Sequence, residues 1–329
     1  MTKKYYRIAE IRDNNKETWD EFVHSCNTGT CYHSYGWNIG LREALKENAV
    51  IYSVENYNHK IVAGFTILEK SKFGIKIGIR PWATPHTGIL LNNSCLKYYD
   101  TLDIIDTIIE FLDSEFHYLQ LAMPVGYKEI YLFQKKKNWN INLKNTYRLI
   151  VNSRNLLEHV EPSTRRQIKK AQKKGIIVHE SNDIRPLFEM YKNLFKKQGN
   201  PIRYSYEDFE KLNEIIYSHK IGKIIYAYFE DRPIAGMIIN IFKNTHYYTI
   251  SSCLPEYLSF GTPSFLLYEY MKTLDDGDVF DFVGALPHME SITKFKSKFN
   301  PYEEPYFLVE KGRNFNTLFN IVRKIRHLI

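Results

Sequence analysis

Two distant segments of the chain share one pattern, Lys60 Ile61 Val62 Ala63 Gly64 Phe65 Thr66 Ile67 and Arg232 Pro233 Ile234 Ala235 Gly236 Met237 Ile238 Ile239. Each segment begins at a polar turn, and each turn follows an apolar run rich in β-branched and aromatic residues, at 50–54 and 223–229. A strand, a polar turn and a second strand form the pattern of a β-hairpin. The same hairpin is therefore predicted twice, which indicates a duplicated fold.

The elements around the two hairpins repeat as well. Apolar periodicity predicts helices at 16–25, 35–46 and 101–114 in the first half, and at 185–198, 206–218 and 263–274 in the second. Strands are predicted at 118–123 and 279–283, and a further one, 146–151, precedes the second half. We predict an α/β (α+β) fold of two tandem domains, at 1–152 and 153–329, each with a mixed, mostly antiparallel sheet flanked by helices.

A strongly basic helix is predicted near the start of the second half, in the run Thr164 Arg165 Arg166 Gln167 Ile168 Lys169 Lys170 Ala171 Gln172 Lys173 Lys174 Gly175. Pro162 suits a first helical turn, and Gly175 suits the left-handed residue after the last one. The spacing of four places the cations in two adjoining stripes and leaves Ile168 and Ala171 to face inward. We expect Arg165, Arg166 and Lys169 to bind phosphates; the alternative is a solvated charged face.

Composition limits the class of protein. A length of 329 residues favours two domains, and 44% hydrophobic residues are typical of packed globular proteins rather than disordered chains. The formal charge of +8 favours an anionic partner without choosing one. The N-terminus lacks the apolar run of a secretion signal, and no stretch approaches the roughly 20 apolar residues that span a bilayer. We therefore predict a cytoplasmic protein.

The four cysteines, Cys26, Cys31, Cys95 and Cys253, show no metal-ligand spacing. In a chain without an export signal they are predicted to be reduced, structural thiols, and no metal site is expected. The alternative is that Cys31 and His33 form a nucleophile and base, but closeness in sequence is not the geometry that such a pair needs.

Several blocks together resemble the FemAB-like branch of the GNAT acyltransferase superfamily. They are the basic helix 165–171 with Gly175, Tyr32 His33 Ser34 Tyr35 Gly36 Trp37, Thr146 Tyr147 Arg148 Leu149, and the late block from Phe280 Asp281 Phe282 Val283 Gly284 to Phe295 Lys296 Ser297 Lys298 Phe299. The resemblance implies two GNAT-like domains in tandem, the second of the FemAB type, and transfer of an acyl or aminoacyl group to an amine. Trp37 and Tyr147, which lie in these blocks, are expected to bind substrate.

Three residues of the late block are candidates for catalysis. The resemblance implies that Lys296 lies near the transferred carbonyl, where an ammonium would stabilise the oxyanion. Asp281 is expected either to act as a general base or to form an ion pair that fixes the following loop. His288, or Glu290 beside it, could take the proton instead.

The segment Arg80 Pro81 Trp82 Ala83 Thr84 Pro85 His86 Thr87 Gly88 in the first half is a stiff loop with a cation, an indole and an imidazole. Arg80, Trp82 and His86 are predicted to bind the acceptor. The alternative is a strand connection held by two prolines.

The donor stays open between acyl-CoA and aminoacyl-tRNA. Coenzyme-A users of the superfamily wrap the pyrophosphate in a Gly-rich turn before a helix, whereas here only Gly261 remains in the stretch 252–263. Users of aminoacyl-tRNA often carry a coiled-coil insertion, and this chain has no heptad run. No cofactor beyond the donor substrate is expected.

The C-terminal stretch 314–329 is predicted to form an amphipathic helix with an apolar face and flanking cations. It could make peripheral contact with the inner face of an anionic membrane, or pack on the second domain.

The function expected from these features is transfer of an acyl or aminoacyl group to an amino group of a cell-envelope precursor or amino sugar. The acceptor would be a nucleotide- or lipid-linked sugar. Two alternatives are an acyl-CoA-dependent N-acyltransferase of surface polysaccharide synthesis, and a non-catalytic nucleotide- or RNA-binding protein.

Overall fold

The computed structural model describes residues 6–92, 96–284 and 289–312. The chain divides into two compact units: unit 1 comprises Met1–Asn38, Glu47–Lys144 and Pro305–Ile329, and unit 2 comprises Ile39–Lys46 and Asn145–Glu304. Strands β7 (Trp139–Ile150) and β13 (Tyr302–Lys311) each begin in one unit and end in the other. The units therefore differ from the predicted division between residues 152 and 153, because a linear pattern does not show that the last strand returns to the first unit.

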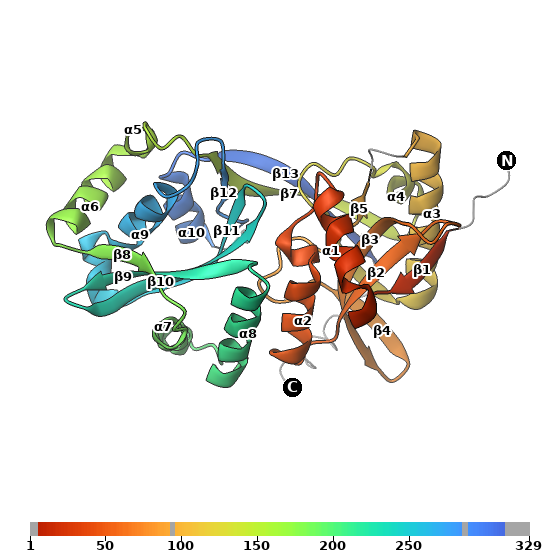
Figure 1. Cartoon of the computed structure of the whole chain (residues 1–329), viewed down its shortest axis with the longest axis horizontal. Coiled ribbons are helices and arrows are strands. Elements are labelled where there is room, and N and C mark those ends of the chain that lie inside the picture. The colour runs from red at the N-terminus through yellow and green to blue at the C-terminus, as the bar shows by residue number, and fades with distance from the viewer. Residues whose placement is uncertain (1–5, 93–95, 285–288, 313–329) are drawn as a thin grey trace. The chain divides into compact units, whose positions relative to one another are not determined.

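Unit 1 is built on a sheet with the strand order β1-β2-β3-β4-β6-β13, and β5 pairs with β3 (Figure 1). Every pair is antiparallel except β4 with β6. Besides β13, its strands are β1 (Arg7–Glu10), β2 (Ala49–Glu55), β3 (Ile61–Lys72), β4 (Ile75–Ile79), β5 (Leu90–Leu91) and β6 (Tyr118–Ala122). The helices are η1 (Asp13–Asn15), α1 (Lys16–Ser25), η2 (Cys31–His33), α2 (Tyr35–Glu43, shared with unit 2), α3 (Tyr98–Glu115) and α4 (Tyr131–Lys135). The apolar face of α3 lies in the core, as its periodicity predicts.

Unit 2 has the strand order β7-β12-β11-β10-β9-β8, which is antiparallel except where β11 meets β12. Its further strands are β8 (Ile177–Glu180), β9 (Gly222–Phe229), β10 (Arg232–Phe242), β11 (Thr245–Cys253) and β12 (Val279–Asp281). Its helices are α5 (Leu156–His159), α6 (Pro162–Lys173), α7 (Arg185–Lys197), α8 (Tyr206–Ser218), η3 (Pro255–Phe260), α9 (Thr262–Met271) and α10 (Glu290–Ser297). Both units thus have the predicted mostly antiparallel sheet flanked by helices.

The repeated Ala-Gly pair has the same role in both hairpins. A Cβ atom on Gly64 would lie 2.5 Å from the ring of Trp19, and one on Gly236 would lie 2.5 Å from the ring of Tyr226. Each glycine therefore leaves room for an aromatic ring to pack directly on the strand backbone. The ring comes from helix α1 in unit 1 and from the neighbouring strand β9 in unit 2, so the two hairpins share the glycine but not the element that packs on it.

The basic helix is α6, and it has the predicted limits and orientation. Pro162 lies in its first turn, and Gly175 adopts a φ of +75° just beyond its end. Thr164, Ile168 and Ala171 are its buried residues. No helix within the described ranges is long and apolar enough to cross a membrane, and the predicted helix at 314–329 lies outside those ranges.

Candidate functional site

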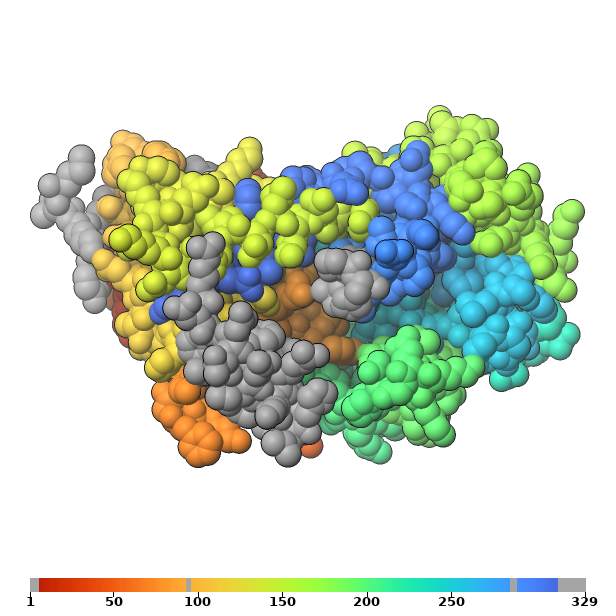
Figure 2. All heavy atoms as spheres, turned by 180° about the vertical axis from the view of Figure 1, so that it is seen from behind, coloured from red at the N-terminus to blue at the C-terminus, as the bar shows by residue number. Residues whose placement is uncertain are grey.

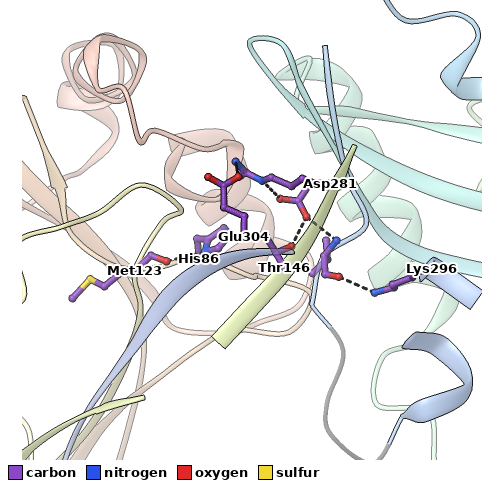
Figure 3. Close-up of polar contacts among 8 residues, drawn as sticks. His86, Met123, Thr146, Asp281, Lys296 and Glu304 are labelled. Carbon is purple, nitrogen blue, oxygen red and sulfur yellow. Dashed lines mark hydrogen bonds and ion pairs between the residues drawn. The ribbon is translucent and has the colours of Figure 1, made fainter. Parts of the chain in front are cut away.

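Lys296, on α10, is a buried cation whose side chain is only 5% exposed. Its Nζ donates a hydrogen bond to the carbonyl oxygen of Val283 at 2.9 Å (Figure 3). It donates a second one to the carbonyl oxygen of Gly284 at 3.2 Å. Burial lowers the pKa of Lys296 to about 8, although the negative charge of Asp281 opposes the shift. With this pKa, roughly nine-tenths of the side chain is protonated at pH 7. The two carbonyls use two of the three N–H donors of the ammonium.

Asp281 ends β12 and is 1% exposed. Its carboxylate accepts hydrogen bonds from Thr146 Oγ1 at 2.5 Å, Arg148 Nε at 2.8 Å and the backbone N–H of Val283 at 2.8 Å. Figure 3 shows Thr146 and Asp281 pointing toward one another from adjacent strands. These three donors fix the orientation of the carboxylate and engage both of its oxygens. Of the two expected roles for Asp281, the geometry favours the ion pair that fixes the following loop.

The loop after Asp281 is strained where it meets Lys296. Val283 has a φ of +61°, a conformation that is unfavourable for a β-branched residue by about 1–2 kcal/mol. Asp281 holds the N–H of Val283, and Lys296 holds its carbonyl oxygen. The side chains of Asp281 and Lys296 thus each form a hydrogen bond with the backbone of the strained residue Val283.

Arg148 and Thr146 belong to this site, although only Tyr147 between them was predicted from the sequence. Alternate residues of a strand face opposite sides, so Thr146 and Arg148 face Asp281 while Tyr147 packs against the hydrophobic core of unit 2. Arg148 also meets a second carboxylate, since its Nη1 lies 3.3 Å from Oε2 of Glu304. Strand alternation around Tyr147 was the signal that could have identified both residues.

The predicted substrate-binding residues of unit 1 are largely internal. Trp37 is buried and donates from Nε1 to Thr84 Oγ1 at 3.0 Å. His86 is buried, donates from Nδ1 to the carbonyl of Met123 at 3.0 Å (Figure 3), and lies edge-to-face on the ring of Tyr306. Arg80 and Trp82 are half-buried in the same loop. For Trp37 and His86 this geometry favours a structural role over acceptor binding.

Cys31 and His33 do not have the geometry of a nucleophile and base. Both ring nitrogens of His33 are engaged, one with Thr30 Oγ1 at 2.7 Å and the other with the carbonyl of Gly88 at 2.9 Å. Burial lowers the pKa of His33 to about 3 and raises the pKa of the Cys31 thiol. His288, the third catalytic candidate, lies outside the described residues.

The cations of α6 differ in what they contact. Lys170 donates to the carbonyl of Ser259 at 2.7 Å, and the Nζ of Lys174 lies 4.3 Å from the ring centre of Phe260. Arg166 and Lys169 are exposed and Arg165 is half-buried. Within the described part of the chain, no carboxylate forms an ion pair with these three. They leave a positive face on unit 2 that could meet phosphates.

The start of α9, where coenzyme-A users hold the pyrophosphate, is closed by α6. Gly261 has a φ of +83°, and a Cβ atom there would lie only 2.5 Å from the backbone oxygen of Gln167. Thr262 and Ser264 in the first turn of α9 are buried. The single glycine that remains therefore serves the packing of two helices, and this connection offers no open Gly-rich turn.

Residues 161–296 match the family model described as acetyltransferase (GNAT) domain, which confirms the predicted superfamily for the second half of the chain.

Solved structures extend the likeness to both units. The crystal structure of FemX is similar with a TM-score of 0.70 at 14% identity, covering 95% of this chain and 99% of that one. The structure of L-PGS from Bacillus licheniformis is similar with a TM-score of 0.56 at 9% identity, covering 90% and 91%. A tandem GNAT protein from the clavulanic acid biosynthesis pathway is similar with a TM-score of 0.53 at 8% identity, covering 94% and 99%. No curated protein matches the sequence. The chain therefore shares its fold with FemX and with a tandem GNAT protein.

Proposed function

We propose that this protein transfers an acyl or aminoacyl group to an amino group of a cell-envelope precursor or amino sugar. The observation that carries the proposal is the buried ammonium of Lys296, held by the carbonyls of a strained loop that Asp281 anchors. A desolvated cation and backbone strain both cost stability, and such features cluster at functional sites. The GNAT match at 161–296 and the FemX-like fold support acyl transfer as the chemistry.

In the proposed reaction, the acceptor nitrogen attacks the carbonyl carbon of the donor and the carbonyl oxygen becomes an oxyanion. The third N–H donor of Lys296 would stabilise that oxyanion in a low-dielectric setting. Collapse of the intermediate breaks the bond to the leaving thiolate or ribose oxygen, which takes up a proton, and the acceptor nitrogen loses one. Asp281 and Arg148 act as positioning residues, because they hold the loop that faces Lys296.

The donor would be acyl-CoA or aminoacyl-tRNA, with Arg165, Arg166 and Lys169 at its phosphates. The acceptor would be a nucleotide- or lipid-linked sugar. Because the start of α9 is closed, the pyrophosphate of a coenzyme-A donor would have to lie on the exposed face of α6 instead.

The test is a transfer assay with both donors and a panel of amino sugars and nucleotide-linked muropeptides. Lys296→Met should lower turnover by about 10²–10³-fold, the usual loss of one oxyanion donor, while the variant stays folded. Lys294→Met, which removes a neighbouring exposed lysine of α10, is the matched control. Equal turnover by the Lys296→Met variant and the wild type would refute the proposed role.

A second candidate function rests on the cations of α6. Because no described carboxylate neutralises Arg165, Arg166 or Lys169, the helix could bind RNA or a nucleotide without catalysis. That function predicts an affinity for RNA that falls steeply as the salt concentration rises. The double variant Arg165→Ala with Arg166→Ala should bind more weakly and show a smaller dependence on salt. No turnover is expected with either donor.

A further inference from the structure

The β3–β4 hairpin of unit 1 carries an exposed aromatic ring at its tip. Lys72 pairs with Ile75, so the turn consists of two residues, Phe73 and Gly74, with φ values of +51° and +76°. The side chain of Phe73 is 91% exposed. The hairpin, orange in both views, extends beyond the sheet to which it belongs (Figures 1 and 2).

Phe73 is a poor choice for this turn. Two-residue hairpin turns with positive φ at both positions favour Asn-Gly or Asp-Gly, and a bulky side chain is disfavoured there. The hairpin turns of unit 2 hold polar residues at the corresponding position, Glu230 between β9 and β10 and Lys243 between β10 and β11. Phe73 therefore serves neither the turn conformation nor the core of unit 1.

The charges around Phe73 indicate the kind of surface that its ring would meet. The tip reads Lys70 Ser71 Lys72 Phe73 Gly74 Ile75 Lys76, with three lysines, two large apolar residues and no acid. Lys76 is paired with Glu69, and Lys70 lies 3.8 Å from Glu47. Lys72 is exposed and has no carboxylate partner among the described residues, and its Nζ lies 5.5 Å from the ring of Phe73. The apex is thus an exposed aromatic ring beside a lysine that no described carboxylate neutralises.

We propose that this tip contacts an anionic lipid bilayer, with Phe73 in the boundary between headgroups and acyl chains and Lys72 at lipid phosphates. An aromatic residue beside a lysine suits that boundary, where one end is apolar and the other meets negative charge. A stable protein partner would need roughly 800 Å² of complementary surface on each side. Beside Phe73, only Ser71, Lys72 and Gly74 of the tip are exposed, whereas a bilayer accepts a single side chain without shape complementarity. The proposal is independent of the transfer chemistry and of residues 314–329.

The test is co-sedimentation of the full-length protein with vesicles of phosphatidylcholine and phosphatidylglycerol at 3:1, and with phosphatidylcholine alone. The wild type should bind the anionic vesicles and release them at 0.5 M salt. Phe73→Asn should weaken the partition constant about tenfold, and Lys72→Gln about fivefold. Because Asn favours positive φ, Phe73→Asn should keep or raise the melting temperature, so a loss of binding would not reflect unfolding.

The matched control is Tyr57→Asn, at another exposed aromatic residue of unit 1, in the β2–β3 connection, and it should bind as the wild type does. If the wild type ignores anionic vesicles, or if Phe73→Asn binds them unchanged, the hairpin is not a membrane contact. If Phe73→Asn instead converts a dimer into monomers in sedimentation velocity without changing vesicle binding, the tip meets a second copy, and the proposal fails.

Discussion

Unit 1 and unit 2 share a fold but treat their buried polar groups differently. In unit 1, the rings of His33 and His86 and the indole of Trp37 are hydrogen-bonded to nearby polar groups, and these side chains fill the core. In unit 2, Lys296 is buried as a cation with a lowered pKa beside a strained Val283. Buried polar residues therefore do not by themselves indicate a catalytic site. Unit 2, where a buried charge and a strained backbone lower the stability of the fold, is the better candidate for the catalytic unit.

The largest effect that would sharpen this contrast is expected from Asp281→Asn. Removing the carboxylate leaves Arg148 with only the partial support of Glu304 and loosens the hold on Val283. We expect a loss of about 3 kcal/mol in the free energy of unfolding, as when one partner of a buried ion pair is removed. Urea unfolding measures it, with Asp275→Asn as the exposed control, which should cost under ~0.5 kcal/mol.

Asp281→Asn also tests whether the ion pair acts on Lys296. The charge of Asp281 raises the pKa of Lys296, so its removal should lower that pKa further. Any alkaline loss of activity should then begin at a lower pH than in the wild type. A variant with unchanged stability and an unchanged pH profile would show that Asp281 has neither role.

Unit 1 should instead reveal its buried histidine through stability in acid. His33 has a pKa lowered to about 3 by burial, so between pH 6.5 and 3 the unfolded chain binds a proton that the folded chain does not. The contribution of His33 to the free energy of unfolding is therefore fully present above pH 6.5. It decreases as the pH falls, by about 2–3 kcal/mol between pH 6.5 and 4.5. Denaturant unfolding across this range should show a flatter profile for His33→Gln, whereas His59→Gln, at an exposed site, should keep the wild-type slope.

The glycines of the two hairpins test what the units share. Gly64→Ala and Gly236→Ala should each cost about 2 kcal/mol, because a Cβ atom 2.5 Å from an aromatic ring forces the ring away. Gly40→Ala is the control, since its Cβ would meet the end of the Leu212 side chain at 3.0 Å and the Ile215 side chain only at an ordinary contact distance of 3.4 Å. Thermal unfolding that changes for one glycine and not the other would break the equivalence of the two hairpins.

The smallest expected effect is a decrease in the transfer rate at alkaline pH. Since the pKa of Lys296 is about 8, the ammonium is lost above that pH, and its contribution should fall about tenfold per pH unit. Lys296→Arg keeps a cation that does not titrate in this range. The ratio of wild-type to variant rate cancels the titration of the acceptor amine. A ratio that rises above pH 8 would assign Lys296 to a base rather than a cation.

Local sequence patterns predicted the elements well and the site only in part. The limits of α1 and α6 followed from apolar periodicity, a proline and a glycine. Lys296 and Asp281 were selected together, and the structure brings both to Val283. Tyr147 was selected where its neighbours Thr146 and Arg148 face Asp281, and Trp37 and His86 were selected although they are internal. Aromatic and imidazole side chains look alike in sequence whether they line a surface or fill a core.

The duplication, the amphipathic helices and the positive face of α6 could be predicted from the sequence. These features depend on periodicity and residue type over a few neighbouring positions. The tertiary structure alone decided that Arg148 meets Asp281 across 133 residues, that Gln167 closes the start of α9, and that Phe73 has no core to enter. These outcomes depend on strand register and on packing between elements far apart in the chain. Such contacts are set by the whole fold and leave no mark in a local pattern.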